Sequence, residues 1–298
     1  MSRSLWPLLF FTVSFLDAYS QQYLGDTFTE DFIFSVQTID DFFDRFNNSP
    51  NSPAISYIKQ KYPKSGNSRS TAILSLFNRA DTTWEKAEIR GFIERFASDT
   101  SNHLNFEQSN WFAVLHSKVI YKSKRLNLDL VMIVEPVFNP QTKSLGYKWS
   151  LYSANARFFP KSDSAKAVVD TGKSKPMIGA DGQFLHPMSH AINFMNIFDV
   201  FKKGVIRKYF ARKARSPELN SLARMVDQGA ISFLQVDSIS YCLAQLPGWI
   251  VEVDYYDRES GNSGWLIRCH QEIHPNFPLT RPPTPSDMAS EPPQLFWL

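Results

Sequence analysis

Residues 110–159 read NWFAVLHSKVIYKSKRLNLDLVMIVEPVFNPQTKSLGYKWSLYSANARFF, and this stretch decides the fold class. It contains three runs rich in β-branched and aromatic residues, at 110–122, 125–138 and 146–159. In the middle run, Leu128, Leu130, Met132 and Val134 alternate with their neighbours and therefore share one side of an extended chain. Turn-forming residues separate the runs. We expect three antiparallel strands joined by short turns.

The segments before these strands have a helical period instead. Apolar residues spaced i, i+3, i+4 and i+7 form one face over 39–46 (Ile39, Phe42, Phe43 and Phe46). Thr38 is a candidate N-cap for this helix, and Asp41 is the expected reciprocal partner of a capping box. Further helices are expected at about 52–61, 70–78 and 83–96. Helices followed by an antiparallel sheet indicate an α+β unit.

The same order of elements returns in the second half of the chain. An apolar face at helical spacing spans 194–201, Ser216 caps a second helix that runs to about Gln228, and strand-like runs follow at 230–246, 249–256 and 264–273. The helical motif at 43–46 also parallels 198–201. These parallels suggest a duplicated unit with a shorter second copy, although similar motifs can recur by chance in an aromatic-rich chain.

The first twenty residues look like a secretory signal peptide. Arg3 precedes the apolar run from Leu5 to Leu16, and the small residues Ala18 and Ser20 stand three and one before a cleavage site ahead of Gln21. The run is shorter than the roughly 20 residues of a membrane-spanning helix. We expect a secreted or periplasmic protein. The expected organisation is a signal peptide at 1–20, a first α+β unit at 28–159, a linker at 160–185, a second α+β unit at 186–275 and a proline-rich tail at 276–298.

Composition and cysteine usage narrow the function classes. The chain is 43% hydrophobic with 25 Phe and 7 Trp, which can fill substantial cores. Its formal net charge of +3 does not indicate a nucleic-acid partner. Cys242 and Cys269 fall on the first and third strands of the expected second sheet, about 10 Å apart. Because a disulfide needs Cα atoms within roughly 7 Å, free thiols are expected.

Helices that precede a bent antiparallel sheet, together with the aromatic leading helix at 38–47, resemble the nuclear transport factor 2-like, or cystatin-like, α+β cone superfamily. The resemblance covers 28–159 and, less well, 186–275. It implies a sheet wrapped around the leading helix, in many members with a ligand held between them. The superfamily includes isomerases, dehydratases, binding modules and dimerisation domains. Its catalytic Asp, His or Tyr has no counterpart by motif in this chain, so no catalytic role is carried over.

Three groups of residues could carry chemistry, and each also has a structural interpretation. His186 and His190, like His270 and His274, stand four apart, as metal ligands on a helix can. Pro187 separates the first pair, and the second lies near a strand end, which favours exposed or capping histidines. Asp40, Asp41 and Asp44 suit a helix N-terminus. The sequence therefore predicts no catalytic residue, no metal site and no cofactor.

The third group is a basic segment, residues 202–215, with seven cations in 14 residues and no acid. Its members are Lys202, Lys203, Arg207, Lys208, Arg212, Lys213 and Arg215. A basic amphipathic segment can contact anionic lipid headgroups or an acidic partner. The alternative is a solvated helix face.

Three functions follow from these patterns. Export, aromatic cores and the lack of a catalytic motif favour a binding or interaction module for an unknown protein or a small apolar ligand. The second function is a small cone-fold hydrolase, isomerase or dehydratase acting in an apolar pocket. The third is an envelope-associated protein that contacts an anionic membrane surface through the basic segment.

Overall fold

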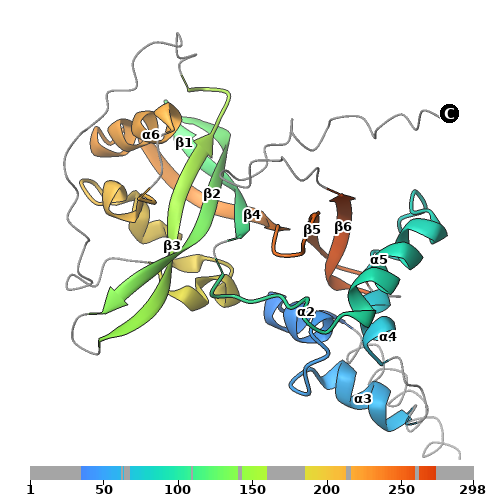
Figure 1. Ribbon diagram of the computed structural model, residues 1–298. Coiled ribbons are helices and arrows are strands. Elements are labelled where there is room, and N and C mark those ends of the chain that lie inside the picture. Colours follow the sequence, from blue (N-terminus) through green and yellow to red (C-terminus); the bar gives the residue numbers. More distant parts are fainter. Residues whose placement is uncertain are drawn as a thin grey trace, which may run out of the picture. The chain divides into compact units, whose positions relative to one another are not determined.

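The computed structural model describes residues 35–61, 63, 68–108, 110–139, 143–159, 185–212, 216–258 and 262–272 (Figure 1). The expected signal peptide, nearly all of the linker and the proline-rich tail lie outside the described residues. The chain divides into two compact units. Unit 1 comprises residues 1–98 and 256–266, and unit 2 comprises 99–255 and 267–298.

Helices build most of unit 1. They are α2 (Ile39–Phe46), α3 (Pro53–Lys61), α4 (Ser68–Ser75) and α5 (Lys86–Ser98). The apolar face of α2 is buried as its spacing predicts, and Phe46 lies 6.3 Å from the Phe96 ring of α5, centroid to centroid. Residues 256–266, which are distant in sequence, complete this unit. The Val36 N–H donates to the Ser263 carbonyl, and the Trp265 N–H donates to the Val36 carbonyl.

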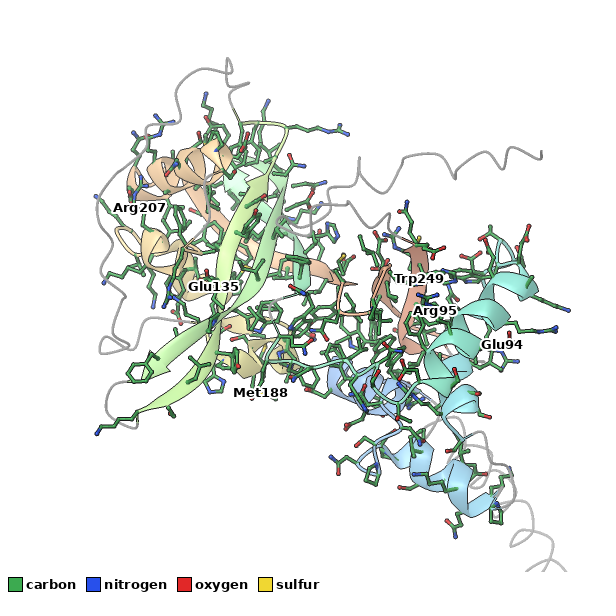
Figure 2. The ribbon with its side chains drawn as sticks, viewed as in Figure 1. Glu94, Arg95, Glu135, Met188, Arg207 and Trp249 are labelled. Carbon is green, nitrogen blue, oxygen red and sulfur yellow. The ribbon has the colours of Figure 1, made fainter. Side chains whose placement is uncertain are left out.

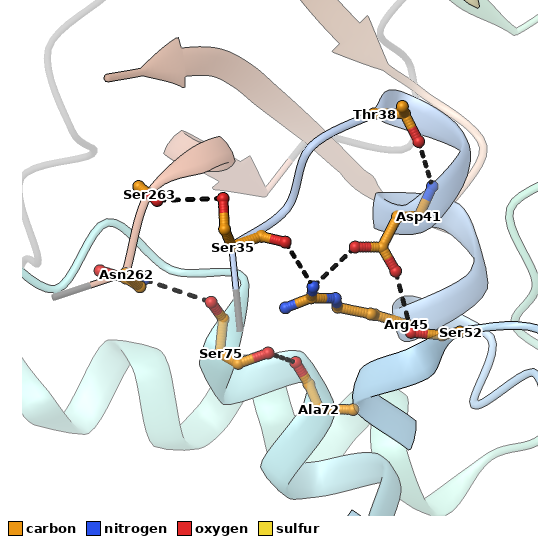
Figure 3. A network of polar contacts seen from close by, with 9 residues as sticks. All are labelled: Ser35, Thr38, Asp41, Arg45, Ser52, Ala72, Ser75, Asn262 and Ser263. Carbon is orange, nitrogen blue, oxygen red and sulfur yellow. Dashed lines mark hydrogen bonds and ion pairs between the residues drawn. The ribbon is translucent and has the colours of Figure 1, made fainter. Parts of the chain in front are cut away.

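A buried arginine organises the polar interior of unit 1 (Figure 3). The Arg45 side chain is 1% exposed and donates to the Ser35 carbonyl at 2.8 Å and to the Asp41 carboxylate at 2.6 Å. The other Asp41 oxygen accepts from the Ser52 hydroxyl at 2.8 Å. Thr38 caps α2 as predicted, since its Oγ1 accepts from the Asp41 N–H. The expected capping box is wrong, however, because the Asp41 carboxylate bonds Arg45 and Ser52 instead of closing back on Thr38.

One antiparallel sheet joins the strands of both halves of the sequence. The strands are β1 (Trp111–Tyr121), β2 (Lys124–Asn139), β3 (Ser144–Asn155), β4 (Ile231–Leu243), β5 (Trp249–Tyr256) and β6 (Gly264–Glu272). Their order is β3-β2-β1-β4-β5-β6, and β1 pairs with β4 along its whole length. Helices plus this sheet make the protein α+β, as predicted. A duplicated unit remains a prediction.

In unit 2, one face of the sheet, here called the inner face, is covered by helices. These are the 3₁₀ helices η1 (Pro187–Ile192), η2 (Met195–Phe201) and η3 (Ile206–Tyr209) and the α-helix α6 (Pro217–Asp227), all of which contact β3 or β4. Trp149 of β3 illustrates the packing, since its indole N–H donates to the Pro187 carbonyl of η1 at 2.9 Å and its ring meets Phe194 edge-on. The expected α-helix at 194–201 is wrong, because residues 195–201 form the 3₁₀ helix η2. Asn193 and Phe194, with left-handed φ angles of 50° and 53°, separate η2 from η1.

Alternation along the strands sends the remaining side chains to the opposite face, here called the outer face. At one end of this face, Phe112, Cys242, Ala244 and Ile250 form a buried apolar cluster. Cys242 and Cys269 do not form a disulfide, as the strand order predicts. Next to the cluster, the pairing of β1 with β4 shifts register between His116 and Ser117, where Asp237 is the extra residue. Such a bulge increases local twist and re-aims nearby side chains.

Candidate functional site

Polar side chains from five neighbouring strands meet in a row across the outer face. This outer row consists of Asp129 (β2), His116 (β1), Ser240 (β4), Asp254 (β5), and Arg268 with Glu252 (β6 and β5). Strand register explains the meeting, because His116 lies opposite Asp129 and Ser240 lies opposite Asp254. Ser240 is diagonal to His116, within reach of a long side chain.

His116 stands at the centre of the first half of the row. Its Nδ1 lies 2.9 Å from Asp129 Oδ1, and its Nε2 lies 3.3 Å from Ser240 Oγ. The His116 and Asp129 side chains are 41% and 39% exposed, so both can be reached from solvent. The pKa of His116 is raised, first by the hydrogen bond that its Nδ1–H donates to Asp129 and then by the negative charges of Asp129 and Asp254, while burial and Arg268 oppose the rise.

Asp254 anchors the second half of the row. Burial raises the pKa of its carboxyl, while the neighbouring Ser240 hydroxyl and the charge of His116 lower it. Arg268 donates from Nε to Asp254 Oδ2 at 2.9 Å and pairs with Glu252 through its terminal nitrogen. Arg268 is thus held between two carboxylates and half exposed. Between the two halves of the row, Ser240 and Asp254 lie opposite each other on β4 and β5.

Asp129, His116 and Ser240 have the atom order of a serine-hydrolase triad, with carboxylate on Nδ1 and hydroxyl on Nε2. One feature separates this arrangement from an activated nucleophile. Because β4 lies between β1 and β5, the ladder occupies the backbone N–H groups that an oxyanion hole would require.

Within the described residues, the basic segment contains the short 3₁₀ helix η3. Lys213 and Arg215 lie outside the described residues, and the rest fall around η3. Lys202 pairs with Asp199 at 2.6 Å, and Arg207, labelled in Figure 2, lies 3.8 Å from Asp227. These acids flank the segment in sequence, so they offset part of its charge. Lys203, Lys208 and Arg212 are exposed.

The described histidines of the two predicted pairs lie in different surroundings. His186 caps η1, since its Nδ1 accepts from the Met188 N–H at 3.1 Å. The expectation of an exposed or capping His190 is wrong, because that ring is 3% exposed and stacks on Phe106. His270 is half-buried, and desolvation lowers its pKa to about 4. His274 lies outside the described residues.

Neither the acids of α2 nor any other described group assembles metal ligands. The Asp41 carboxylate is committed to Arg45 and Ser52, and partial burial is the main cause of a raised pKa at Asp44. Within the described ranges, His, Cys, Asp and Glu do not gather in threes as a metal site requires. In the same part of the chain, no helix is long and apolar enough to cross a membrane.

Large apolar side chains are also exposed on the β2–β3 hairpin and on η1 and η2 of unit 2. Phe138 and Leu145 face each other across the end of the β2–β3 hairpin and are 54% and 60% exposed. On η1 and η2, Met188 (labelled in Figure 2), Ile192, Met195 and Phe198 are 45–67% exposed. Trp149 bridges to Leu185, which brings the start of η1 beside β3. The elements that expose them are neighbours, since η1 contacts both β3 and η2. We call these six residues the apolar patch, although the ring of Phe198 also packs edge-on against Phe233 of β4.

The sequence offered only a weak signal for the outer row. His116 and Asp129 each occupy the polar side of an alternating strand, but their pairing depends on the β1–β2 register. The contact of His116 with Ser240, which is 124 residues further along the chain, depends on the pairing of β1 with β4. Comparisons with protein-family models, curated proteins and solved structures found no match. Functional inference for this chain therefore rests on its sequence patterns and geometry.

Proposed function

We propose that this chain is an exported binding module that engages a protein partner through the apolar patch of unit 2. The exposure of the patch is the observation that carries the proposal. Monomeric soluble proteins seldom expose several large apolar side chains together, and where they do the patch commonly marks an interaction site. Two of the six residues are methionines, whose flexible side chains adapt to a partner surface. Export is supported by the pattern of residues 1–20.

Site-specific photo-crosslinking in the producing cell tests this function directly. A photoreactive residue at Leu145 or Met195 should yield the same crosslinked partner, because hairpin and η2 would contact one surface. Gln235 of β4 is an exposed polar control in the same unit and should yield none. The double change Phe138→Ser, Leu145→Ser should abolish crosslinking from Met195 without lowering the melting temperature, since exposed side chains contribute little to stability. No crosslink at either position, or equal crosslinking at Gln235, would remove the proposal.

A second function, a small hydrolase of the cone-fold type, is favoured by one observation, the order Asp129–His116–Ser240. A fluorophosphonate probe distinguishes it from the binding module. If Ser240 were the nucleophile, the probe should label it in the wild-type protein and not after Asp129→Asn, because the carboxylate orients the imidazole. Ser238, exposed on the same strand, gives the background labelling. Labelling of Ser240 at that background would exclude this function.

Kinship with the nuclear transport factor 2-like superfamily also remains our proposal. It is supported by the order of the elements, helices before a long antiparallel sheet. Contact of the basic segment with an anionic membrane is a third proposal, supported by the exposure of Lys203, Lys208 and Arg212. Reversing the charge of Lys203 and Lys208 should abolish sedimentation with phosphatidylserine vesicles, and unchanged sedimentation would exclude it.

A further inference from the structure

The paired ends of β2 and β3 form a two-stranded arm in unit 2 (Figure 1). β1 pairs with β2 only as far as Ile133, whereas β2 and β3 stay paired as far as Asn139 and Ser144. β3 is also the terminal strand of the sheet. The arm therefore has two edges, and the backbone groups on each edge decide whether a further strand can add to it.

The backbone of β3 shows which of its groups point away from β2. The Trp149 N–H donates to the Leu185 carbonyl at 3.0 Å, so Trp149 turns its hydrogen-bonding groups outward. Because these groups alternate in an antiparallel ladder, Tyr147 and Leu145 turn theirs outward as well. Among the residues that the structure describes, none pairs with Leu145 or Tyr147 on this side. Strand pairing along the described edge thus stops at Trp149 and leaves two outward positions open.

A proline blocks the opposite edge of the arm. Pro136 of β2 lies directly opposite Tyr147, at a position where the two residues do not hydrogen-bond to each other. The Pro136 nitrogen therefore faces the other edge, where its ring replaces the N–H that an added strand would need. One edge is protected against strand addition, and the β3 edge is not.

We propose that the β3 edge of the arm binds an extended segment of the partner protein as a further strand, with apolar and acidic residues alternating along that segment. This inference rests on the proposed function, because it says how the partner of the apolar patch is held. In strand addition, main-chain hydrogen bonds give affinity and side chains at alternate positions give specificity.

One side of the added strand would face the apolar patch. Leu145 lies opposite Phe138 and on the same side of β3 as Trp149, whose indole N–H donates to the Pro187 carbonyl of η1. Every second side chain of the added strand would point to this side, beside the exposed Leu145 and Met188. Apolar residues suit those positions.

The other side of the arm carries exposed positive charge. Lys148 points to this side, opposite Glu135, and Lys143 at the turn and Arg212 are exposed. Glu135 is buried, and its Oε1 accepts from the Arg212 N–H at 2.9 Å. Acidic residues of the added strand would complement these cations. A second copy of the chain fits less well, because antiparallel pairing of two β3 edges about Gly146 would bring Lys148 of each copy beside Lys143 of the other.

Amide hydrogen exchange in the full mature chain tests whether the edge is open and what it accepts. The Leu145 and Tyr147 amides should exchange faster than those of Gly146 and Lys148, which face β2. A short synthetic peptide that alternates valine and glutamate should slow exchange at Leu145 and Tyr147, and one that alternates valine and lysine should not. Equal protection of all four amides in the free chain, no slowing by the glutamate peptide, or equal slowing by both peptides would overturn the proposal.

A matched pair of variants separates strand addition from simple contact with the apolar patch. Tyr147→Pro removes the outward N–H without breaking a hydrogen bond to β2, whereas Tyr147→Val removes the same ring and keeps the N–H. The amide spectrum shows whether each variant is folded. Proline should abolish the slowing of Leu145 exchange by the glutamate peptide and the crosslinking of the partner from Met195, and valine should preserve both. If the two variants crosslinked the partner equally, strand addition would be refuted and the apolar patch would stand as the binding site. No crosslink in the wild-type protein would remove the proposed function, and this inference with it.

Discussion

Gly264 pairs with Val36 where two segments of unit 1 that are distant in sequence meet. Its φ of +87° lies in the left-handed region, and a Cβ there would overlap the Val36 carbonyl. Val36 is fully buried and held by hydrogen bonds on both its N–H and its carbonyl, so it cannot move aside cheaply. We therefore expect Gly264→Ala to lower the free energy of unfolding by about 3 kcal/mol or more, measured by urea denaturation.

Gly91 provides the control of opposite sign in the same unit. It lies in the middle of α5 with open space around the position of a Cβ. Gly91→Ala should raise the free energy of unfolding by about 0.5–1 kcal/mol, because alanine favours a helix interior. A Gly264→Ala protein as stable as the wild type would show that the Val36–Gly264 approach is not maintained.

Arg45 tests whether the polar interior of unit 1 contributes to stability. Arg45→Met keeps much of the apolar stem but leaves the Asp41 carboxylate and the Ser35 carbonyl without their guanidinium donor. Removing one partner of a buried pair costs about 3–5 kcal/mol, and the 16% exposure of Asp41 places the expected loss near the lower end. Urea denaturation measures it, with exposed Lys59→Met expected to remain within about 0.5 kcal/mol. Equal effects of the two changes would contradict this account.

At the scale of the elements, the outer row predicts a fall in stability above neutral pH. A histidine whose folded pKa is raised stabilises the fold fully below its unfolded pKa of about 6.5, and this contribution disappears as the pH rises through the folded pKa. His270 affects the stability of the fold over a separate range of pH. Its pKa is lowered to about 4, so stability should rise with pH between about 4 and 6.5.

Urea midpoints followed by tryptophan fluorescence between about pH 4 and 8.5 resolve the two effects. We expect a maximum near the ordinary histidine pKa of about 6.5 in the wild-type protein. His116→Gln should remove the decline above it and preserve the rise below it. His103→Gln should change neither limb, since His103 is exposed. A His116→Gln protein that retained the alkaline decline would assign that decline to another group.

The same scale shows how far local sequence predicts these elements. The ends of α2, β1 and β5 fall within a few residues of their expected positions, because capping and alternation are local properties. The 194–201 segment differs. Its apolar spacing fits an α-helix, yet Asn193 and Phe194 adopt left-handed conformations, and packing of Phe194 against Trp149 compensates for that backbone cost. The spacing of apolar residues alone does not show where tertiary packing outweighs a local preference for an α-helix.

Pairings between segments that are distant in sequence could not be predicted from local sequence patterns. The sequence predicts strands on both sides of the linker, but not that β1 and β4 lie together in one sheet. Nor does any local pattern place residues 256–266 beside Val36, because these segments are more than 200 residues apart. The outer row and the interior of unit 1 both depend on such contacts, so the candidate site emerges only when the chain is folded.

Export is the property of the whole molecule that a single measurement can settle. We expect the mature protein to begin at Gln21, since Ala18 and Ser20 supply the small residues that a signal peptidase requires. Ser20→Leu should block cleavage and leave residues 1–20 attached, because a bulky side chain does not fit the position before the cut. Tyr19→Phe, at the position between the two small residues, should be processed normally. Mass spectrometry of the intact protein from the producing cell reads the terminus. Two results would contradict export through this segment: a wild-type chain that retained Met1 to Ser20, or a Ser20→Leu chain cleaved as efficiently as the wild type. Either result would remove export from the proposed function. The role of the apolar patch would still be tested by crosslinking.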